Sequence, residues 1–277
     1  MTSLTIFSSP KPFTNPHIAM IQRNAIQSWL NMGSEVEVIL VGEESGMDEI
    51  AKEYRVKLVK DVSRNIRGTP LVSSIFELAR EASQSPLMVY VNTDIILFPE
   101  FVEVATKIHR LVKEFLVIGR RWDLDIEQKL DFSEGWERRL KAEVVHRGWL
   151  HPPAGSDYFI FPKSTIIEMP NFAIGRAGWD NWMIYNARKQ GWDVIDATKT
   201  LIVIHQNHDY SHLPGGRPHY DLDESNQNMA LAGGLTHMYN VLDSNKEFFD
   251  GKIRSPGFSL IRTLRKLELW LTPEDGQ

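Results

Sequence analysis

The sequence predicts an α/β fold: a mostly parallel sheet flanked by helices, with an embellished C-terminal half. Strand-length apolar stretches alternate with segments of helical periodicity over residues 4–119. One stretch, residues 87–91, is apolar throughout, which is typical of a strand buried on both faces. The 277 residues contain no internal repeat and no obvious linker. We therefore expect one domain.

The predicted elements follow one another in strand–helix order. Strands are expected at residues 4–8, 36–41, 56–59, 87–91 and 115–119, and helices between them at 17–30, 47–54, 71–82 and 101–112. Pro70 is expected in the first turn of the helix at 71–82. This alternation argues for a parallel sheet covered by helices, and right-handed crossovers follow from it. In the less regular second half, helices are expected at 134–145 and 179–189, and strands at 157–161, 194–195 and 201–204.

Composition argues against several classes of protein. The formal net charge is −5, so bulk electrostatics do not favour binding to nucleic acid. The chain has no cysteine, which rules out disulfides, thiolate metal ligands and cysteine nucleophiles. We see no signal peptide at the N-terminus and no apolar stretch long enough to cross a membrane. We therefore expect a soluble, cytoplasmic protein.

The end of the buried strand carries the strongest functional signal. Asp94 leaves this strand after Asn92 and Thr93, and apolar residues follow it at once. Ligands bind beyond the carboxyl ends of strands in doubly wound sheets. A carboxylate there is costly unless it meets a cation or several donors. Asp94 is therefore either a ligand for Mg²⁺ or Mn²⁺ that holds a diphosphate, or a cap on the following turn.

These residues resemble a known family. Asn92-Thr93-Asp94 is similar to the Asp-X-Asp motif of GT-A glycosyltransferases, although Asn92 replaces the first Asp and removes one charge. Three later segments resemble motifs of that family in the same order: residues 155–161, 178–182 and 204–208. The resemblance covers roughly residues 4–212.

The resemblance implies one GT-A-like, Rossmann-like domain with three parts. These are a nucleotide-binding half at 1–98, an acceptor and catalytic half at 99–212, and a C-terminal extension at 213–277. It also implies that Asp94 contacts Mn²⁺ or Mg²⁺, with Asn92 and Thr93 beside the nucleotide.

Two carboxylates are candidates for the base that the resemblance implies. Asp180 lies at the start of a predicted helix, in the segment where the family often has its base. In an inverting transfer such a carboxylate removes the acceptor hydroxyl proton as that oxygen attacks. Asp157 is the second candidate, and could instead orient the acceptor or sugar hydroxyls. From the residues alone, Asp180 can also be an ordinary first-turn acid that stabilises its helix.

Three histidines follow the strand expected at 201–204: His205, His208 and His212. The resemblance implies that His205 joins Asp94 on the metal. The residues alone leave two alternatives. One is a hydrolytic zinc site made by all three imidazoles. The other is a set of hydrogen-bonded loop histidines, which we favour for His212.

The nucleotide must be held by strand-end loops, because the chain has neither a P-loop nor a Rossmann glycine fingerprint. Ser8, Ser9 and Lys11 follow the first strand, where enzymes of this family often contact base and ribose. Glu43 follows the second strand and is either a partner for a uracil or guanine edge or a solvated loop acid. Arg67 could reach a phosphate.

The acceptor side is less clear from the sequence. The middle of the chain is rich in tryptophan, at Trp122, Trp136, Trp149, Trp179 and Trp182. Some of these indoles could stack on sugars, while most are expected to pack in the core.

The C-terminal segment 258–271 is amphipathic and carries Arg262, Arg265 and Lys266. It could dock as a peripheral helix on an anionic membrane, pack on its own domain, or bind a partner subunit.

The sequence therefore predicts a metal-assisted glycosyltransferase. The donor is a nucleotide-sugar, most simply a UDP- or GDP-sugar, and the acceptor is a hydroxyl of a glycan or another molecule. We expect inversion, with Asp180 as the base. A sugar-nucleotide nucleotidyltransferase and a non-catalytic carbohydrate-binding protein on the same fold are the alternatives, because a fold does not prove a chemistry.

Overall fold

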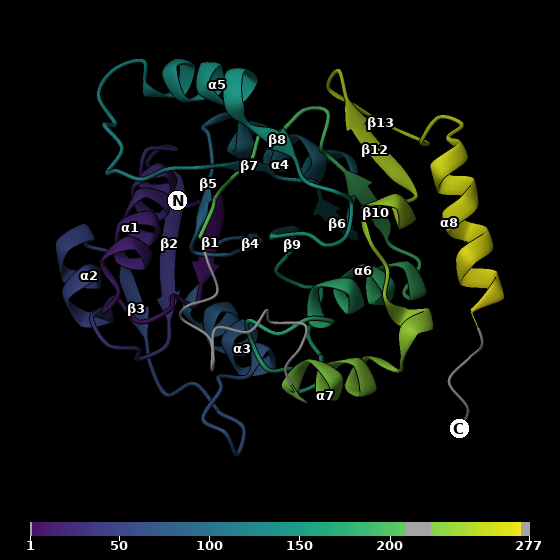
Figure 1. Ribbon diagram of the computed structural model, residues 1–277, viewed down its shortest axis with the longest axis horizontal. Coiled ribbons are helices and arrows are strands. Elements are labelled where there is room, and N and C mark those ends of the chain that lie inside the picture. The colour runs from purple at the N-terminus through teal and green to yellow at the C-terminus, as the bar shows by residue number, and fades with distance from the viewer. Residues whose placement is uncertain (1, 209–222, 273–277) are drawn as a thin grey trace.

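A mixed sheet of nine strands runs through the centre of the molecule, seen in a computed structural model that describes residues 2–208 and 223–272 (Figure 1). From one edge to the other its strands are β13 (Lys252–Arg254), β12 (Lys246–Phe249), β10 (Asp193–Asp196), β6 (Phe115–Ile118), β9 (Tyr158–Pro162), β4 (Leu87–Val91), β1 (Leu4–Ser8), β2 (Val36–Val41) and β3 (Lys57–Val59). A smaller sheet has the order β5 (Ile95–Ile96), β11 (Ile204–Gln206), β7 (Trp122–Leu124) and β8 (Trp149–Leu150).

The expected parallel pairing is confirmed for most of the large sheet. Strands β3, β2, β1 and β4 are parallel neighbours, as are β6, β10 and β12. Strand β9 lies between the two groups and is antiparallel to both β4 and β6. Edge strand β13 is antiparallel to β12. The sheet is thus mostly parallel, with its one internal reversal next to β4.

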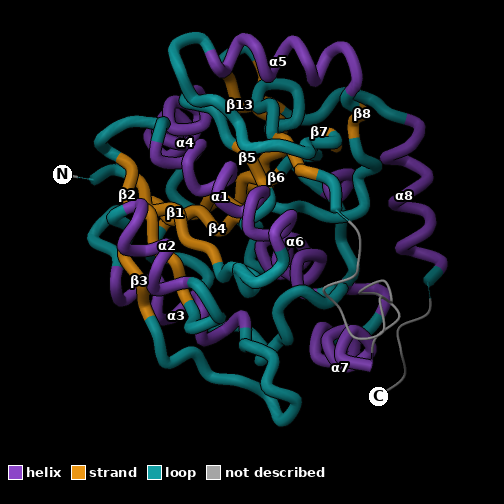
Figure 2. The backbone as a smooth tube through the Cα atoms, turned by 60° about the vertical axis from the view of Figure 1, so that its left-hand side comes forward, coloured by secondary structure: helices purple, strands orange, loops and turns teal. Residues whose placement is uncertain are grey.

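Helices cover both faces of the large sheet (Figure 2). One face packs against α1 (Pro16–Leu30), α2 (Met47–Tyr54) and α4 (Glu100–Leu111), and the other against α3 (Val72–Ala82) and α6 (Trp179–Lys189). Helix α5 (Trp136–Arg147) packs with residues of the smaller sheet. Because both faces are covered, all five residues of β4 are buried, as the apolar sequence predicted.

The C-terminal part adds further elements to this frame. Besides β12 and β13 it contains α7 (Asp223–Ala232), two 3₁₀ turns (Leu235–His237 and Val241–Asp243) and α8 (Leu260–Leu271). In the part of the chain that the structure describes, no helix has both the length and the apolar character needed to span a bilayer.

Two local expectations are wrong. The strand expected at 201–204 forms instead at Ile204–Gln206, because β11 pairs with β5 and β7 only over these residues. Pro70 precedes α3 rather than lying in its first turn, since it forms a bridge with Arg64 and Leu71 occupies the N-cap.

Candidate active site

The segment after β4 is held rigidly by hydrogen bonds from several elements. The backbone N–H of Gln206 donates to the Asp94 carbonyl at 3.1 Å, and its side-chain amide donates to the same oxygen at 3.2 Å. The Trp29 indole donates to the Ile95 carbonyl at 3.0 Å. The Thr93 and Ser8 hydroxyls lie 2.6 Å apart and are both buried. Asp94 therefore lies in a fixed backbone position at the carboxyl end of a central strand.

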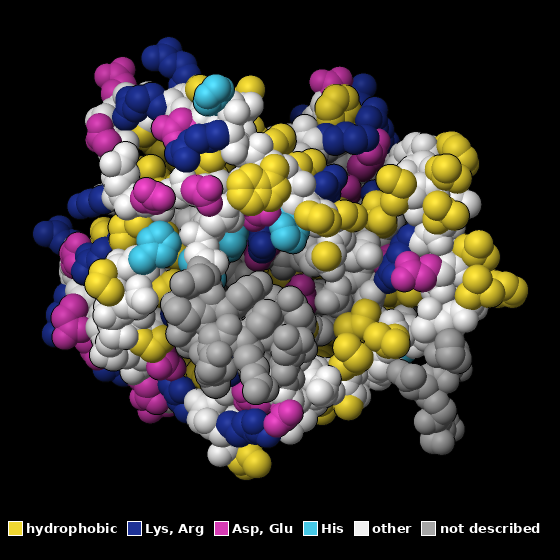
Figure 3. Space-filling model, in the orientation of Figure 1, with side chains coloured by type: hydrophobic (Ala, Val, Ile, Leu, Met, Phe, Trp, Pro, Cys, Tyr) yellow, Lys and Arg dark blue, Asp and Glu magenta, His cyan; other side chains and the backbone are white. Residues whose placement is uncertain are grey.

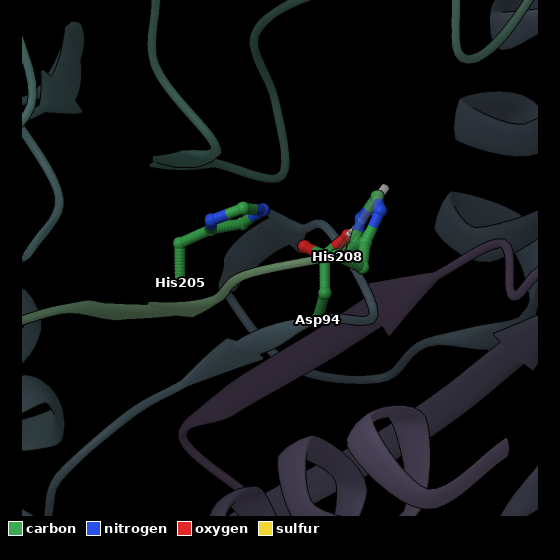
Figure 4. A group of neighbouring side chains, drawn as sticks. All are labelled: Asp94, His205 and His208. Atoms are coloured by element: carbon green, nitrogen blue, oxygen red, sulfur yellow. Dashed lines mark hydrogen bonds and ion pairs between the residues drawn. The ribbon is translucent and has the colours of Figure 1, made fainter. Parts of the chain in front are cut away.

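The Asp94 side chain lies beside His205, on β11, and His208, two residues after that strand (Figure 4). One ligand atom from each of Asp94, His205 and His208 falls within 4.8 Å of the others. Asp94 Oδ2 is 3.1 Å from His208 Nε2 and 3.4 Å from Lys11 Nζ. Asp94 Oδ1 is buried and has no hydrogen-bond partner among the described residues. A buried carboxylate oxygen without a partner destabilises the fold unless a cation lies against it.

These residues fit a divalent metal ion. The Lys11 ammonium lies 3.0 Å from His208 Nε2 and 3.4 Å from Asp94 Oδ2, so two of the three proposed metal ligands already face a positive charge. Burial by itself raises the pKa of Asp94, but Lys11 and the two histidines outweigh it and hold this pKa well below its ordinary value. One carboxylate and two imidazoles suit a transition metal such as Mn²⁺ better than Mg²⁺, which prefers oxygen ligands.

His205 is oriented by a buried carboxylate on β7. Its Nδ1 lies 3.1 Å from Asp123 Oδ1, whose side chain also meets His151 Nδ1 at 2.6 Å and Arg121 Nε at 2.9 Å. With Nδ1 donating to Asp123, His205 presents its other nitrogen as a neutral ligand, the usual arrangement in metal sites. Burial alone raises the pKa of Asp123, but its bonds to His151, His205 and Arg121 lower it far below the ordinary range.

Replacing Asp123 by Asn is expected to weaken Mn²⁺ binding about 10–100-fold, because His205 loses the carboxylate that fixes its tautomer and ring orientation. Electron paramagnetic resonance of free Mn²⁺ during a titration measures this affinity directly. Asp131→Asn, an exposed change on the same domain, serves as the control. Equal Mn²⁺ affinity in wild type and Asp123→Asn would contradict the assigned role.

Asn92 takes part in a network that needs an amide. Its Nδ2 donates to Asp157 Oδ1 at 2.9 Å, and its Oδ1 accepts from the Tyr90 hydroxyl at 2.9 Å. Asp157 Oδ1 also accepts from Arg121 at 2.7 Å. A carboxylate at position 92 would face that of Asp157 with no proton between them. This contact favours Asn over Asp at position 92.

Asn92→Asp is therefore expected to destabilise the fold at pH 8 by about 1–3 kcal/mol. This loss of stability should be smaller at pH 5. One of the two neighbouring carboxyl groups then keeps a proton in the folded state, so repulsion between two negative charges no longer opposes folding. Thermal melts at both pH values test this. Asn171→Asp adds the same charge at an exposed position and should have little effect. An unchanged or higher melting temperature of Asn92→Asp at pH 8 would refute the argument.

Asp180 lies half-buried in the first turn of α6. Burial raises its pKa to about 6, and the charge of Asp157 adds to the rise, while backbone N–H groups of the helix start oppose it. Gly155 packs against this carboxylate, since a Cβ at position 155 would collide with Asp180 Oδ2. A carboxylate with a pKa near 6 is well suited to accept a proton near neutral pH.

The carboxylates of Asp94, Asp157 and Asp180 converge on one region. Asn92, two residues before Asp94, donates to Asp157. Gly155, two residues before Asp157, packs against the Asp180 carboxylate. Burial raises the pKa of Tyr90, and the charges of the three acids raise it further. The fold therefore brings together the predicted metal ligand and both predicted catalytic acids, although they are far apart in the sequence.

The other predicted nucleotide contacts are spread more widely. Ser8 is fully buried and its hydroxyl donates to the Val91 carbonyl at 2.6 Å, whereas Ser9 is partly exposed. Glu43 is exposed, 3.9 Å from Arg64, and Arg67 is exposed and pairs with Asp223 at 3.1 Å. No contact of Glu43 or Arg67 with the metal-ligand group is found among the described residues. His212 lies outside them.

Most tryptophans named above pack in the interior. Trp179 contacts Tyr90 edge to face at 5.0 Å, and Trp136 stacks on Phe98 at 5.3 Å. Trp149 on β8 is the most open of them, at 49% exposure, and it precedes His151 by two residues. Its exposure makes it the strongest candidate among them for stacking on a sugar.

Sequence reasoning missed Asp123 and His151 as parts of the site, and it left Arg121 open between contact with an anionic acceptor and pairing with nearby acids, of which the structure shows the pairing. Asp123 lies on β7, Arg121 directly before it and His151 directly after β8, and neither of these short strands was predicted. Their only signal was a stretch rich in arginine and acid near residue 122.

The fold is shared with known glycosyltransferases. No protein-family model matches the sequence, and no curated protein is significantly similar to it. Residues 1–349 of TarS from S. aureus, solved with UDP-GlcNAc, match with a TM-score of 0.51 at 12% identity, over 84% of this chain and 66% of theirs. Glucosyl-3-phosphoglycerate synthase from Mycobacterium tuberculosis, solved with Mn²⁺, UDP and phosphoglyceric acid, matches with a TM-score of 0.51 at 16% identity. That match covers 94% of this chain and 88% of the synthase. At such identities the likeness establishes the architecture alone, and this chain has the fold of the GT-A glycosyltransferases.

Proposed function

We propose that this protein is a glycosyltransferase that moves a sugar from a UDP-sugar to an acceptor hydroxyl. One observation carries the proposal: a carboxylate and two imidazoles meet at the end of β4, in a fold shared with proteins solved with UDP, UDP-GlcNAc and Mn²⁺. Ligand sites lie beyond the carboxyl ends of strands in sheets of this kind.

Asp94, His205 and His208 would hold the metal ion. When bound, a divalent ion supplies positive charge to the diphosphate of the donor and to the departing nucleoside diphosphate. Lys11 lies against the same carboxylate and could turn its ammonium to a phosphate oxygen. Ser9, Asn92 and Thr93 would line the binding site of the donor's nucleoside. Glu43 and Arg67 would contact the donor only where their loops approach it.

Asp180 is the proposed base of an inverting transfer. Its carboxylate, with a pKa near 6, is mostly ionised at pH 7 and can take the proton of the attacking hydroxyl. Gly155 keeps the space beside this carboxylate free of a side chain. Asp157, held by Arg121 and Asn92, is ion-paired and so is better suited to orienting hydroxyl groups than to accepting a proton.

The test is a product assay with three arms. The protein is incubated with Mn²⁺ and UDP-glucose or UDP-GlcNAc and a mixture of hydroxyl acceptors, and release of UDP is followed. A second arm supplies UTP and a sugar 1-phosphate and follows pyrophosphate, the product of a nucleotidyltransferase. A third measures sugar binding without turnover. Metal-dependent release of UDP supports the proposal. Release of pyrophosphate alone would indicate a nucleotidyltransferase instead. Sugar binding with no turnover would indicate a non-catalytic carbohydrate-binding protein.

A further inference from the structure

Helix α8 presents its apolar side chains to solvent. Four leucines are between 48% and 64% exposed, and Trp270 is 79% exposed. The exposed apolar residues of this segment are Phe258, Leu260, Ile261, Leu264, Leu267, Trp270 and Leu271. The helix stands at the rim of the molecule, and hydrophobic side chains gather along this rim (Figures 1 and 3). Contiguous apolar patches of this kind mark interaction sites on monomeric domains.

The opposite side of α8 is polar and is fixed to the domain. Arg262 donates to the carbonyls of Leu242 and Ser244 at 2.7 and 3.0 Å and lies 3.3 Å from Asp196. Arg265 donates to the Met238 carbonyl at 2.6 Å and pairs with Asp243 at 3.2 Å. Both arginine side chains are largely buried, at 16% and 13% exposure. These bonds set the rotation of the helix and keep its apolar side outward.

The exposed leucines form a narrow seam. Leu260, Leu264, Leu267 and Leu271 are spaced by four, three and four residues. At about 100° per residue they fall within an arc of about 60°. This spacing is the one that lets two helices pack side by side with interlocking side chains. Ile261 and Glu268 flank the seam on one side, and Thr263 and Trp270 on the other. The residues turned to the domain occupy the back of the helix, where paired helices make no mutual contact.

We propose that a second copy of this chain covers α8, with the two helices packing against each other about a two-fold axis. In such an isologous contact the same leucine seam supplies both surfaces. A membrane surface fits less well. Two of the three basic residues that suggested it, Arg262 and Arg265, are turned into the domain, and Arg265 also pairs with Glu268 at 2.9 Å, which leaves Lys266 as the third, facing solvent. The chain also has a net charge of −5, which opposes an anionic bilayer.

Sedimentation equilibrium of the full chain tests the proposal. Wild type should sediment at about twice the protomer mass of 31.8 kDa at micromolar concentration. The variant Leu264→Glu/Leu267→Glu should be a monomer, with its dimer dissociation constant raised about 100-fold or more, because it places carboxylates at the centre of the seam. Both residues are exposed, so the variant should keep the wild-type circular dichroism spectrum.

The matched control is Thr263→Glu/Lys266→Glu, which adds the same number of carboxylates to α8 outside the seam. It should remain a dimer, with a dissociation constant within about tenfold of wild type. A monomeric wild type would overturn the proposal, as would a control that dissociates as readily as the leucine variant. Flotation with vesicles of phosphatidylcholine and phosphatidylserine distinguishes the lipid alternative. A monomer that binds them through Leu264 and Leu267 would place a membrane on this face instead.

Discussion

Asp94→Asn is expected to abolish Mn²⁺ binding and to reduce sugar transfer by at least about 100-fold. The substitution keeps the size of the side chain but removes the only carboxylate of the proposed metal-ligand group. A metal ion stabilises charge on a departing group by several kcal/mol, and each 1.4 kcal/mol of lost stabilisation is a factor of ten in rate. Electron paramagnetic resonance gives the bound Mn²⁺, and UDP release gives the rate.

The matched control for this result is Asp48→Asn. Asp48 pairs with Lys60 on the surface of α2, and exposed ion pairs of this kind contribute little. It should bind Mn²⁺ and transfer sugar as wild type does. If Asp94→Asn bound Mn²⁺ as tightly as this control, the metal ligands would have to lie elsewhere.

Asp180→Asn is expected to lower the transfer rate by about 10²–10⁴-fold while leaving Mn²⁺ and UDP binding intact. The range is what a positioned general base contributes, and the amide retains the shape and the helix-start contacts of the carboxylate. Comparison of the turnover rate with the UDP dissociation constant separates a lost base from a damaged donor site. A variant that turned over at more than a tenth of the wild-type rate would remove Asp180 from the mechanism.

The pH dependence of wild type provides a second check on the same residue. With its pKa raised to about 6, Asp180 is ionised and active above pH 6, so turnover should level off there and fall about tenfold per pH unit below it. Ionisation of Asp180 favours activity but disfavours folding. Because the pKa of Asp180 is higher in the folded state than in the unfolded state, the charged carboxylate destabilises the fold above pH 6. Asp180→Asn should therefore melt no lower than wild type at pH 7.5. An inactive variant with a reduced melting temperature would indicate structural damage instead.

The sequence was most informative where a run of apolar residues corresponds to a strand that is buried in the structure. Residues 87–91 predicted a strand covered on both faces, and β4 is buried throughout because α-helices lie on both sides of the sheet. That strand also located Asp94 at its carboxyl end, where ligands bind in sheets of this kind, although the residues alone left a metal ligand and a cap on the following turn as alternatives. His205 was placed on the metal by the family resemblance, and His208, named at first only for the zinc alternative, lies in the same group.

The remaining features depend on pairings that no local pattern specifies. Strand β9 is antiparallel to β4, and its five residues are all buried, a pattern that fits either direction. Asp123 orients His205 from 82 positions away, through a strand of only three residues. Amphipathicity located α8, but only the bonds of Arg262 and Arg265 reveal that its polar side faces inward.

Calorimetric titration of UDP into the protein, with Mn²⁺ and then with EDTA, tests the central claim most directly. The claim is that the group formed by Asp94, His205 and His208 holds a metal ion that binds the diphosphate of a donor. It predicts one UDP per chain in Mn²⁺ and affinity at least about tenfold weaker in EDTA, a difference of about 1.4 kcal/mol or more. Equal affinity in the two buffers would remove the metal from the mechanism, and no binding of UDP in either would remove the donor site.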